Sequence, residues 1–126
     1  LIEVTRRSLD RGIAECRSHG HLGDIGAAIE AEVEKAGFSV VSGLTGHGVG
    51  FELHEEPTIY NYGEKGTGIE IKPGMVFAIE PMVAIGSGDV KQIKDDSFVT
   101  KDGSLTAHFE HTIAITENGV EILTKE

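Results

Sequence analysis

The apolar residues of this 126-residue chain change their spacing once, at Gly37, and this change limits the folds that the chain can adopt. Before Gly37, Ile25, Ile29 and Val33 recur at the spacing of one helix face. After it, short apolar runs with a two-residue period alternate with glycine-rich turns, which is typical of strands. The order predicts two helices followed by a mainly antiparallel sheet, an α+β arrangement.

Each predicted helix has a boundary signal. The apolar face of the first consists of Ile2, Leu9, Ile13 and Cys16. We expect this helix to end near Gly20, and the chain to start inside or just before a helix of a longer protein. Asp24 is the predicted N-cap of the second helix, and Gly37 is the left-handed residue predicted to end it.

The part after Gly37 is predicted as strands joined by loops. Asn118-Gly119, between two apolar runs, is a strong signal for a two-residue hairpin. The other predicted segments are, in chain order, a short strand at 38–41, a glycine-dense loop at 43–50, a turn-rich stretch at 55–68, a strand at 75–84, a hairpin at 91–103 and a strand at 105–116.

Composition excludes some classes of function. The formal net charge of −10 argues against nucleic-acid and anionic-membrane partners, because phosphate groups bind to positive surfaces. The sequence has no long apolar run and no signal-peptide pattern at its start, so we expect a cytoplasmic protein. The single Cys16 leaves histidines and carboxylates as the plausible metal ligands.

His47 is a candidate ligand because glycines flank it on both sides, in Gly46-His47-Gly48. Glycine admits unusual backbone dihedrals and the close approach of an ion or substrate. By itself the motif is weak, because a histidine in a glycine-rich loop is more often simply exposed.

Glu80 and Glu110 each lie in the middle of a predicted strand. Alternation places Glu80 on one face with Val76 and Ala78, where a buried carboxylate is costly unless a cation or hydrogen bonds compensate it. For either residue alone, a solvent-facing position on a sheet edge is an equally good interpretation. Together with His47, the two carboxylates favour a site for manganese, iron or cobalt.

Three segments carry a family resemblance: Gly46 to Gly50 with His54-Glu55-Glu56-Pro57, the run 72–83, and the run 102–112. In order, spacing and flanking residues they resemble the type I methionine aminopeptidases, essentially from end to end of the chain. The resemblance implies a pita-bread fold, of which residues 1–126 would be the C-terminal half. It also implies removal of N-terminal methionine from peptides and nascent proteins.

The resemblance implies a role for each candidate residue. His47, Glu80 and Glu110 would be ligands of two divalent ions (Co, Mn, Fe or Zn), with Glu110 as the bridge. Glu80 would also pass a proton to the leaving amine, and His54 would contact the scissile amide. Leu53 and Phe98 would border the methionine pocket, whereas His111 would be structural.

The sequence departs from the family pattern in several places. His108 stands where the family usually has Gln, Phe98 where many members have Trp, and Leu53 where some have Phe. No aspartate of the chain lies in a family-like ligand motif, so two ligands would come from an N-terminal half absent from this sequence. We therefore expect at most one weakly bound ion and no activity in the chain alone, and either self-association or pairing with that half.

Two other functions stay open. Proline-specific aminopeptidases and dipeptidases of the same fold share the Gly-His-Gly loop and the Ile-Glu-Pro strand, although Met82 and the run 109–112 favour the methionine enzymes. A non-catalytic binding module of the same fold is the alternative from another class, because a fold does not fix a function.

Overall fold

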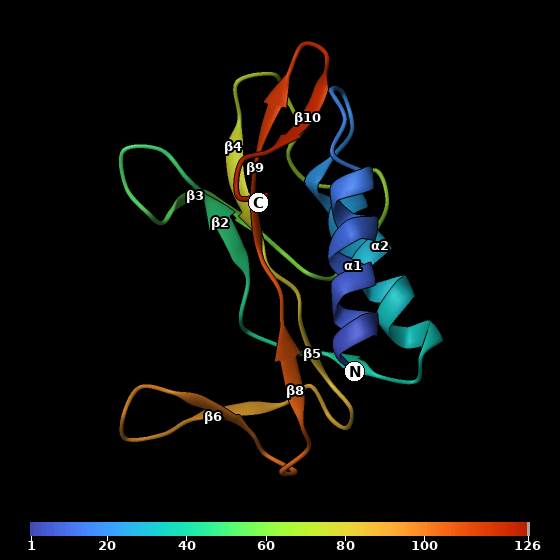
Figure 1. The fold of residues 1–126 in the computed structure, drawn as a ribbon, viewed down its shortest axis with the longest axis vertical. Helices are drawn as coiled ribbons and strands as arrows, with labels where there is room; N and C mark the ends of the chain where they lie inside the picture. The colour runs from blue at the N-terminus through green and yellow to red at the C-terminus, as the bar shows by residue number, and fades with distance from the viewer. Residues whose placement is uncertain (126) are drawn as a thin grey trace.

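The computed structural model describes residues 1–125, and its elements follow the predicted order of helices and then strands (Figure 1). The helices are α1 (Ile2–Ala14) and α2 (Leu22–Lys35). The strands are β1 (Ser39–Val40), β2 (Gly46–Gly48), β3 (Glu55–Ile59), β4 (Val76–Ile79), β5 (Met82–Ala84), β6 (Val90–Gln92), β7 (Phe98–Thr100), β8 (Thr106–His108), β9 (His111–Thr116) and β10 (Gly119–Ile122).

Helix α1 ends at Ala14, so the prediction of an end near Gly20 was wrong. His19 takes a left-handed φ of 68°, which a continuing helix cannot contain. Its backbone N–H donates to the carbonyl of Ile71 at 3.0 Å, and Ile71 N–H donates to the carbonyl of Gly20 at 2.8 Å. The chain therefore leaves the helix early because this segment pairs with a later part of the chain.

Helix α2 begins at Leu22 with His21 as its N-cap, so Asp24 is not the cap that the sequence predicted. Asp24 is the third helical residue, and its carboxylate accepts the N–H of His21 at 2.9 Å and that of Gly66 at 2.7 Å. These backbone hydrogen bonds lower the pKa of Asp24. At the other end Gly37 has φ 75°, which confirms the predicted left-handed stop.

All strand pairs are antiparallel, and the α+β fold class is confirmed. A five-stranded sheet has the order β10-β9-β4-β2-β3, and a three-stranded sheet has the order β1-β5-β8. Strands β6 and β7 pair only with each other within the described residues.

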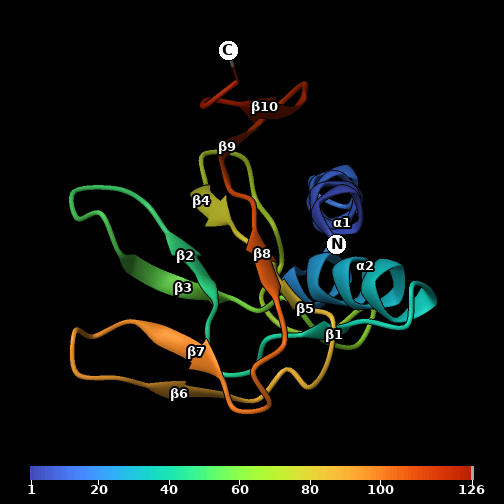
Figure 2. The ribbon, with the colours of Figure 1, turned by 60° about the horizontal axis from the view of Figure 1, so that its bottom comes forward.

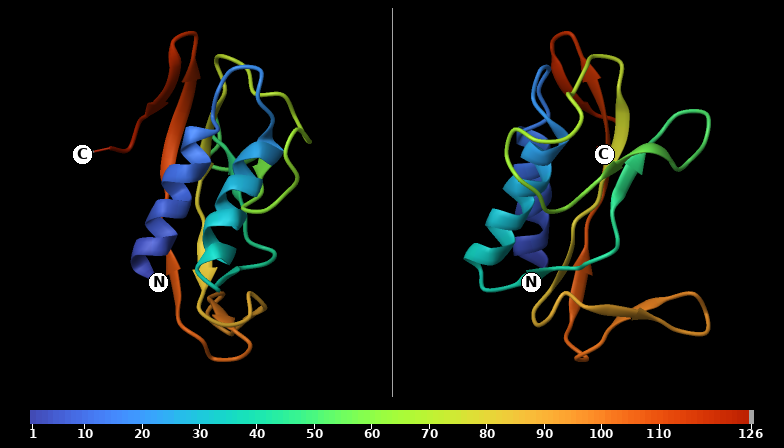
Figure 3. Two further views of the ribbon diagram at one scale, coloured as in Figure 1. Left: turned by 90° about the vertical axis from the view of Figure 1, so that its right-hand side faces the viewer. Right: turned by 180° about the vertical axis from the view of Figure 1, so that it is seen from behind.

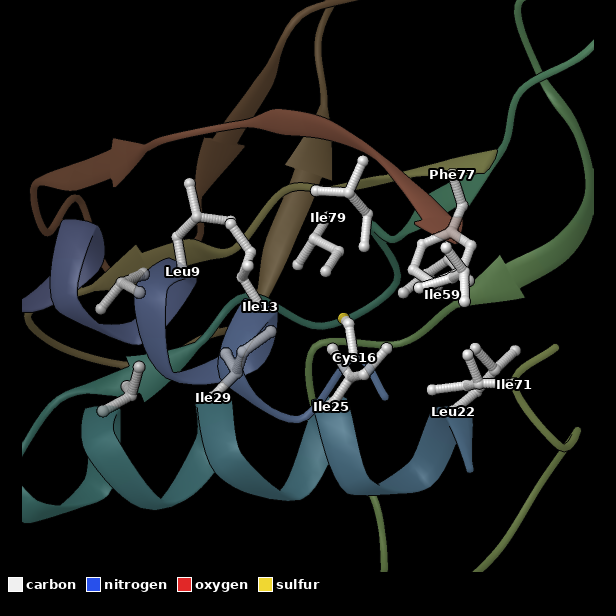
Figure 4. Packing of buried hydrophobic residues seen from close by; sticks show 14 residues of the cluster. Leu9, Ile13, Cys16, Leu22, Ile25, Ile29, Ile59, Ile71, Phe77 and Ile79 are labelled. Carbon is white, nitrogen blue, oxygen red and sulfur yellow. The ribbon is translucent and has the colours of Figure 1, made fainter. Parts of the chain in front are cut away.

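The two helices lie side by side over one face of the sheets (Figure 3). Their apolar faces meet the strands in a core that includes the fully buried Ile25 and Ile29 of α2 and Phe77 and Ile79 of β4 (Figure 4). The helices thereby fix the rear of the sheets, and the hairpins β2-β3 and β6-β7 project on the other side (Figure 2). Neither helix is long and apolar enough to cross a membrane.

Each of the two long predicted strands is in fact broken at its glutamate. The run 75–84 forms β4 and β5 with Glu80 and Pro81 between them, and the run 105–116 forms β8 and β9 with Phe109 and Glu110 between them. Because β4 pairs with β9 and β5 with β8, the two breaks face each other. Pro81 has no N–H to donate to a ladder, which explains the first break.

The glycine-dense segment is not only a loop, as the sequence predicted, because it contains strand β2 between β3 and β4. A Cβ at Gly46 would overlap the carbonyl oxygen of Ala78, and one at Gly48 would overlap that of Glu56. The glycines at 46 and 48 therefore allow the neighbouring strands to pack closely against β2, rather than making a loop flexible. The turn-rich stretch likewise begins with β3. The last hairpin is confirmed, although Gly119 already pairs with Thr116, so the turn lies one residue earlier than predicted.

Candidate metal centre

Three ligand-type side chains converge on one point from distant parts of the sequence. His47 comes from β2, Glu80 from the break between β4 and β5, and Glu110 from the break between β8 and β9. One potential ligand atom of each lies within 4.8 Å of the others, the only such group within residues 1–125. The convergence is what a shared metal site requires, and the role of the three as ligands stays a prediction.

His47 is held in an orientation suited to binding a cation. Its Nδ1 lies 2.9 Å from the carbonyl oxygen of Gly48, a contact that requires the proton on Nδ1. This leaves Nε2 with a free lone pair, as in metal-binding histidines. Nε2 points to Oε1 of Glu80 at 3.3 Å, and the side chains of both residues are only 14% and 15% exposed.

The spacing of these two atoms fits an ion between them. Ligand atoms about 2.1 Å from a divalent ion, at tetrahedral or octahedral angles, lie about 3.0–3.4 Å apart. The observed 3.3 Å between Nε2 of His47 and Oε1 of Glu80 falls in this range. One imidazole and two carboxylates form a nitrogen and oxygen donor set that suits transition metals of intermediate softness.

The second oxygen of Glu80 has a partner of its own. Nε2 of His108 lies 3.3 Å from Oε2 of Glu80. The hydrogen bond to Glu80 raises the pKa of His108. His108, one of the residues that depart from the family pattern, is therefore in direct contact with a candidate ligand.

The main chain of Glu80 also has a side-chain partner. Nδ2 of the fully buried Asn61 donates to the carbonyl oxygen of Glu80 at 3.1 Å. The role of Asn61 was not predicted, because a single Asn between Tyr60 and Tyr62 carries no local signal of a distant partner.

His54 lies beside His47, with ring centroids 4.2 Å apart. It is exposed, and therefore open to a substrate, at the end of the β2–β3 loop. Leu53 in the same loop is 71% exposed. His111, by contrast, contacts Thr124 through Nδ1 at 2.8 Å, which agrees with a structural role.

Phe98 is 48% exposed and borders a cavity of about 190 Å³ that His108 and Met82 also line. His108 lines this cavity and also contacts Glu80, so the cavity lies next to the candidate metal centre. A larger cavity of about 560 Å³ lies elsewhere, between the start of α2 and residues 56–69. None of the three candidate ligands lines it, so we place the chemistry at the histidine and carboxylate cluster instead.

Comparison with known proteins identifies relatives over nearly the whole chain. Residues 1–117 match the profile of metallopeptidase family M24. The chain is 52% identical over 126 residues to methionine aminopeptidase 1 of Bacillus subtilis, covering 99% of this chain and 51% of that protein. It thus spans about half the length of the curated relatives that it matches.

Solved structures agree with this comparison. The methionine aminopeptidase from Thermotoga maritima superposes with a TM-score of 0.96 at 52% identity, covering all of this chain and 51% of that one. The prolidase from Pyrococcus furiosus superposes with a TM-score of 0.73 at 26% identity, covering 99% of this chain and 32% of that one. The similarity is therefore stronger to the methionine enzyme than to the proline-specific one.

Proposed function

The chain belongs to metallopeptidase family M24, and from this premise we propose that it forms part of the active site of a methionine aminopeptidase. The observation that carries the proposal is the convergence of His47, Glu80 and Glu110. The 52% identity to the methionine aminopeptidases of two bacteria, against 26% to a prolidase, supports methionine rather than proline specificity.

The proposed reaction is hydrolysis of the first peptide bond of peptides and nascent proteins that begin with methionine, in the cytoplasm. His47, Glu80 and Glu110 would hold two divalent ions of Co, Mn, Fe or Zn, with Glu110 between them. Such ions lower the pKa of a coordinated water and stabilise negative charge that develops on the substrate carbonyl.

The chain's own side chains would then orient the substrate and move a proton. Glu80 would carry a proton to the leaving amine, because its carboxylate lies at the centre of the cluster with His47 and His108 on either side. His54, exposed beside His47, would donate a hydrogen bond to the scissile amide. Leu53 and Phe98, both exposed apolar side chains, would contact the methionine side chain.

Three protein ligands can hold one ion, but they are too few to hold two. We propose that the remaining ligands come from the other half of the enzyme, since the chain matches only about half the length of its relatives. That half would belong to the same protein or to a partner chain, and self-association is the alternative. Residues 1–126 by themselves would bind at most one ion weakly and would not cleave peptides.

The test uses a purified preparation that includes the other half, loaded with Co²⁺ or Mn²⁺, and measures its hydrolysis of Met-Ala-Ser and of dipeptides with proline in second position. We expect metal-dependent release of methionine from Met-Ala-Ser and little turnover of the proline peptides. Turnover of the proline peptides alone would assign the protein to the proline-specific enzymes. Tight metal binding with no hydrolysis of either, by a preparation that includes the other half, would instead indicate the non-catalytic binding module.

A further inference from the structure

We propose that Asn61 is a positioning residue that holds the backbone of Glu80 so that its carboxylate stays in the metal centre. The inference rests on the proposed role of Glu80 as a ligand. It extends that role to a residue that would touch neither metal nor substrate.

Glu80 needs such support because it lies outside both strand ladders. Ile79 is the last residue of β4 in register, opposite His111, and Met82 is the first of β5, opposite His108. Pro81 lacks the N–H that could extend either ladder. The amide of Asn61 supplies the donor for the carbonyl of Glu80, at 3.1 Å.

The segment that carries Asn61 is itself held in place. It packs so closely on α2 that a Cβ at Gly26 would overlap the carbonyl oxygen of Tyr62 and lie 2.9 Å from that of Tyr60. The two tyrosine side chains are 49% and 38% exposed, whereas Asn61 between them is fully buried. The Asn61 amide is thus fixed by α2 on one side and reaches Glu80 on the other.

Packing alone does not account for an amide at this position. Oδ1 of Asn61 is buried and has no hydrogen-bond partner among the described residues. A buried acceptor without a partner is unfavourable, and an apolar side chain of the same shape would avoid it. The bond from Nδ2 to Glu80 is the one polar contact of the amide among the described residues, and it acts on a candidate ligand.

The consequence is a specific expectation for metal affinity. Loss of the hydrogen bond lets the break between β4 and β5 move, so Oε1 of Glu80 no longer stays 3.3 Å from Nε2 of His47. Removing a residue that orients a ligand typically weakens metal binding about 10–100-fold.

The experiment titrates a metal-free purified preparation that includes the other half with Co²⁺ and follows its visible absorption, which reports both affinity and ligand geometry. Asn61→Leu keeps the shape and removes the donor. Asn61→Ala removes the same donor and leaves a cavity, for the case in which leucine does not fit. Asn118→Ala, in the exposed β9–β10 turn, is the matched control. Thermal unfolding without metal is measured for all four proteins.

We expect Asn61→Leu to weaken Co²⁺ binding about 10–100-fold and to change the spectrum, with metal-free stability close to that of the unsubstituted protein. Asn118→Ala should change neither. Unchanged Co²⁺ affinity in a folded Asn61 variant would overturn the positioning role while leaving the metal centre intact. If neither variant folds, Asn61 is required for folding and the positioning role is likewise overturned. Failure of the unsubstituted protein to bind Co²⁺ would instead refute the metal centre itself.

Discussion

His47 reaches the candidate site from inside a regular ladder, whereas Glu80 and Glu110 reach it from two places where the ladders stop. The backbone around His47 pairs with β3 on one side and β4 on the other. The two glutamates lie between paired segments, where one backbone hydrogen bond, from Phe109 N–H to the carbonyl oxygen of Pro81 at 3.4 Å, joins the two breaks. The candidate ligand His47 is thus held by the sheet, whereas the candidate ligand Glu80 is contacted by the side chains of Asn61 and His108.

The difference also determines where substitutions are tolerated. Beside His47, even a methyl group is excluded, because Gly46 and Gly48 touch the backbone of the neighbouring strands. At the break that contains Glu80, the contacts that a substitution would remove are those of the Asn61 and His108 side chains. The predictions below test this contrast, beginning with the largest effect.

In a preparation that includes the other half, Glu110→Ala should abolish most of the metal-dependent activity, since it removes a proposed ligand at a break. The loss should exceed about 100-fold, because even substitutions behind the ligands cost 10–100-fold. Peptide hydrolysis and bound metal are both measured. Glu55→Ala, in the ladder strand β3, is the control and should matter far less. Equal losses at the two positions would remove the reason to treat Glu110 as a ligand.

His54→Ala should lower turnover about 100-fold, the scale for loss of one donor to a developing oxyanion. Bound metal should change little, because the His54 ring lies near that of His47 but His54 is not one of the three converging residues. His47→Ala is the matched variant and should lose metal and turnover together. Metal content determined after gel filtration separates the two cases, and a comparable metal loss in both variants would make His54 a ligand.

Gly48→Ala should destabilise the metal-free protein by about 1–3 kcal/mol, as overpacking of a close contact does. The added methyl group would press on the backbone of Glu56, which cannot move without disturbing β3. Urea unfolding measures the change. Gly20→Ala is the control, because the atom nearest to its added methyl group is farther away, at 3.2 Å. A harmless Gly48→Ala would show that the ladder around His47 is less rigid than its packing implies.

Phe98→Ala should have the smallest effect, a weakening of substrate binding by about 1 kcal/mol. Full burial of such a side chain is worth about 1.5–3 kcal/mol, and Phe98 is 48% exposed. KM for Met-Ala-Ser should rise while Co²⁺ affinity stays the same. A fall in Co²⁺ affinity would mean that the β6–β7 hairpin helps to position the strand breaks that carry Glu80 and Glu110.

Local patterns predicted the elements whose signals lie within a few neighbouring residues. Helix α2, its stop at Gly37 and the last hairpin followed from spacing and turn chemistry. The convergence of His47, Glu80 and Glu110 was expected because a carboxylate buried in a strand needs a compensating cation; this holds for Glu80, whereas Glu110 is exposed.

The features that were mispredicted depend on partners far along the chain. Alternation could not reveal the break at Glu110, because no proline or glycine marks it and only its partner strand explains it. The strand at Gly46–Gly48 was hidden because its glycines look like a loop until the neighbouring strands are known. The N-cap was misassigned because the Asp24 carboxylate accepts hydrogen bonds from the backbone N–H groups of both His21 and the distant Gly66.

Strands β5 and β8 pair with each other, and the segment between them in sequence, which contains the β6–β7 hairpin, therefore starts and ends at neighbouring points. Met82 faces His108 and Ala84 faces Thr106, so the chain leaves and rejoins the sheet at one place. When strand pairing already holds the two ends of a loop together, lengthening the loop has only a small entropic cost. We therefore expect insertions and deletions in residues 86–104 to be tolerated without moving either glutamate. If the proposed function holds, a different recognition loop grafted there would change which peptides are accepted and leave the candidate metal centre as it is.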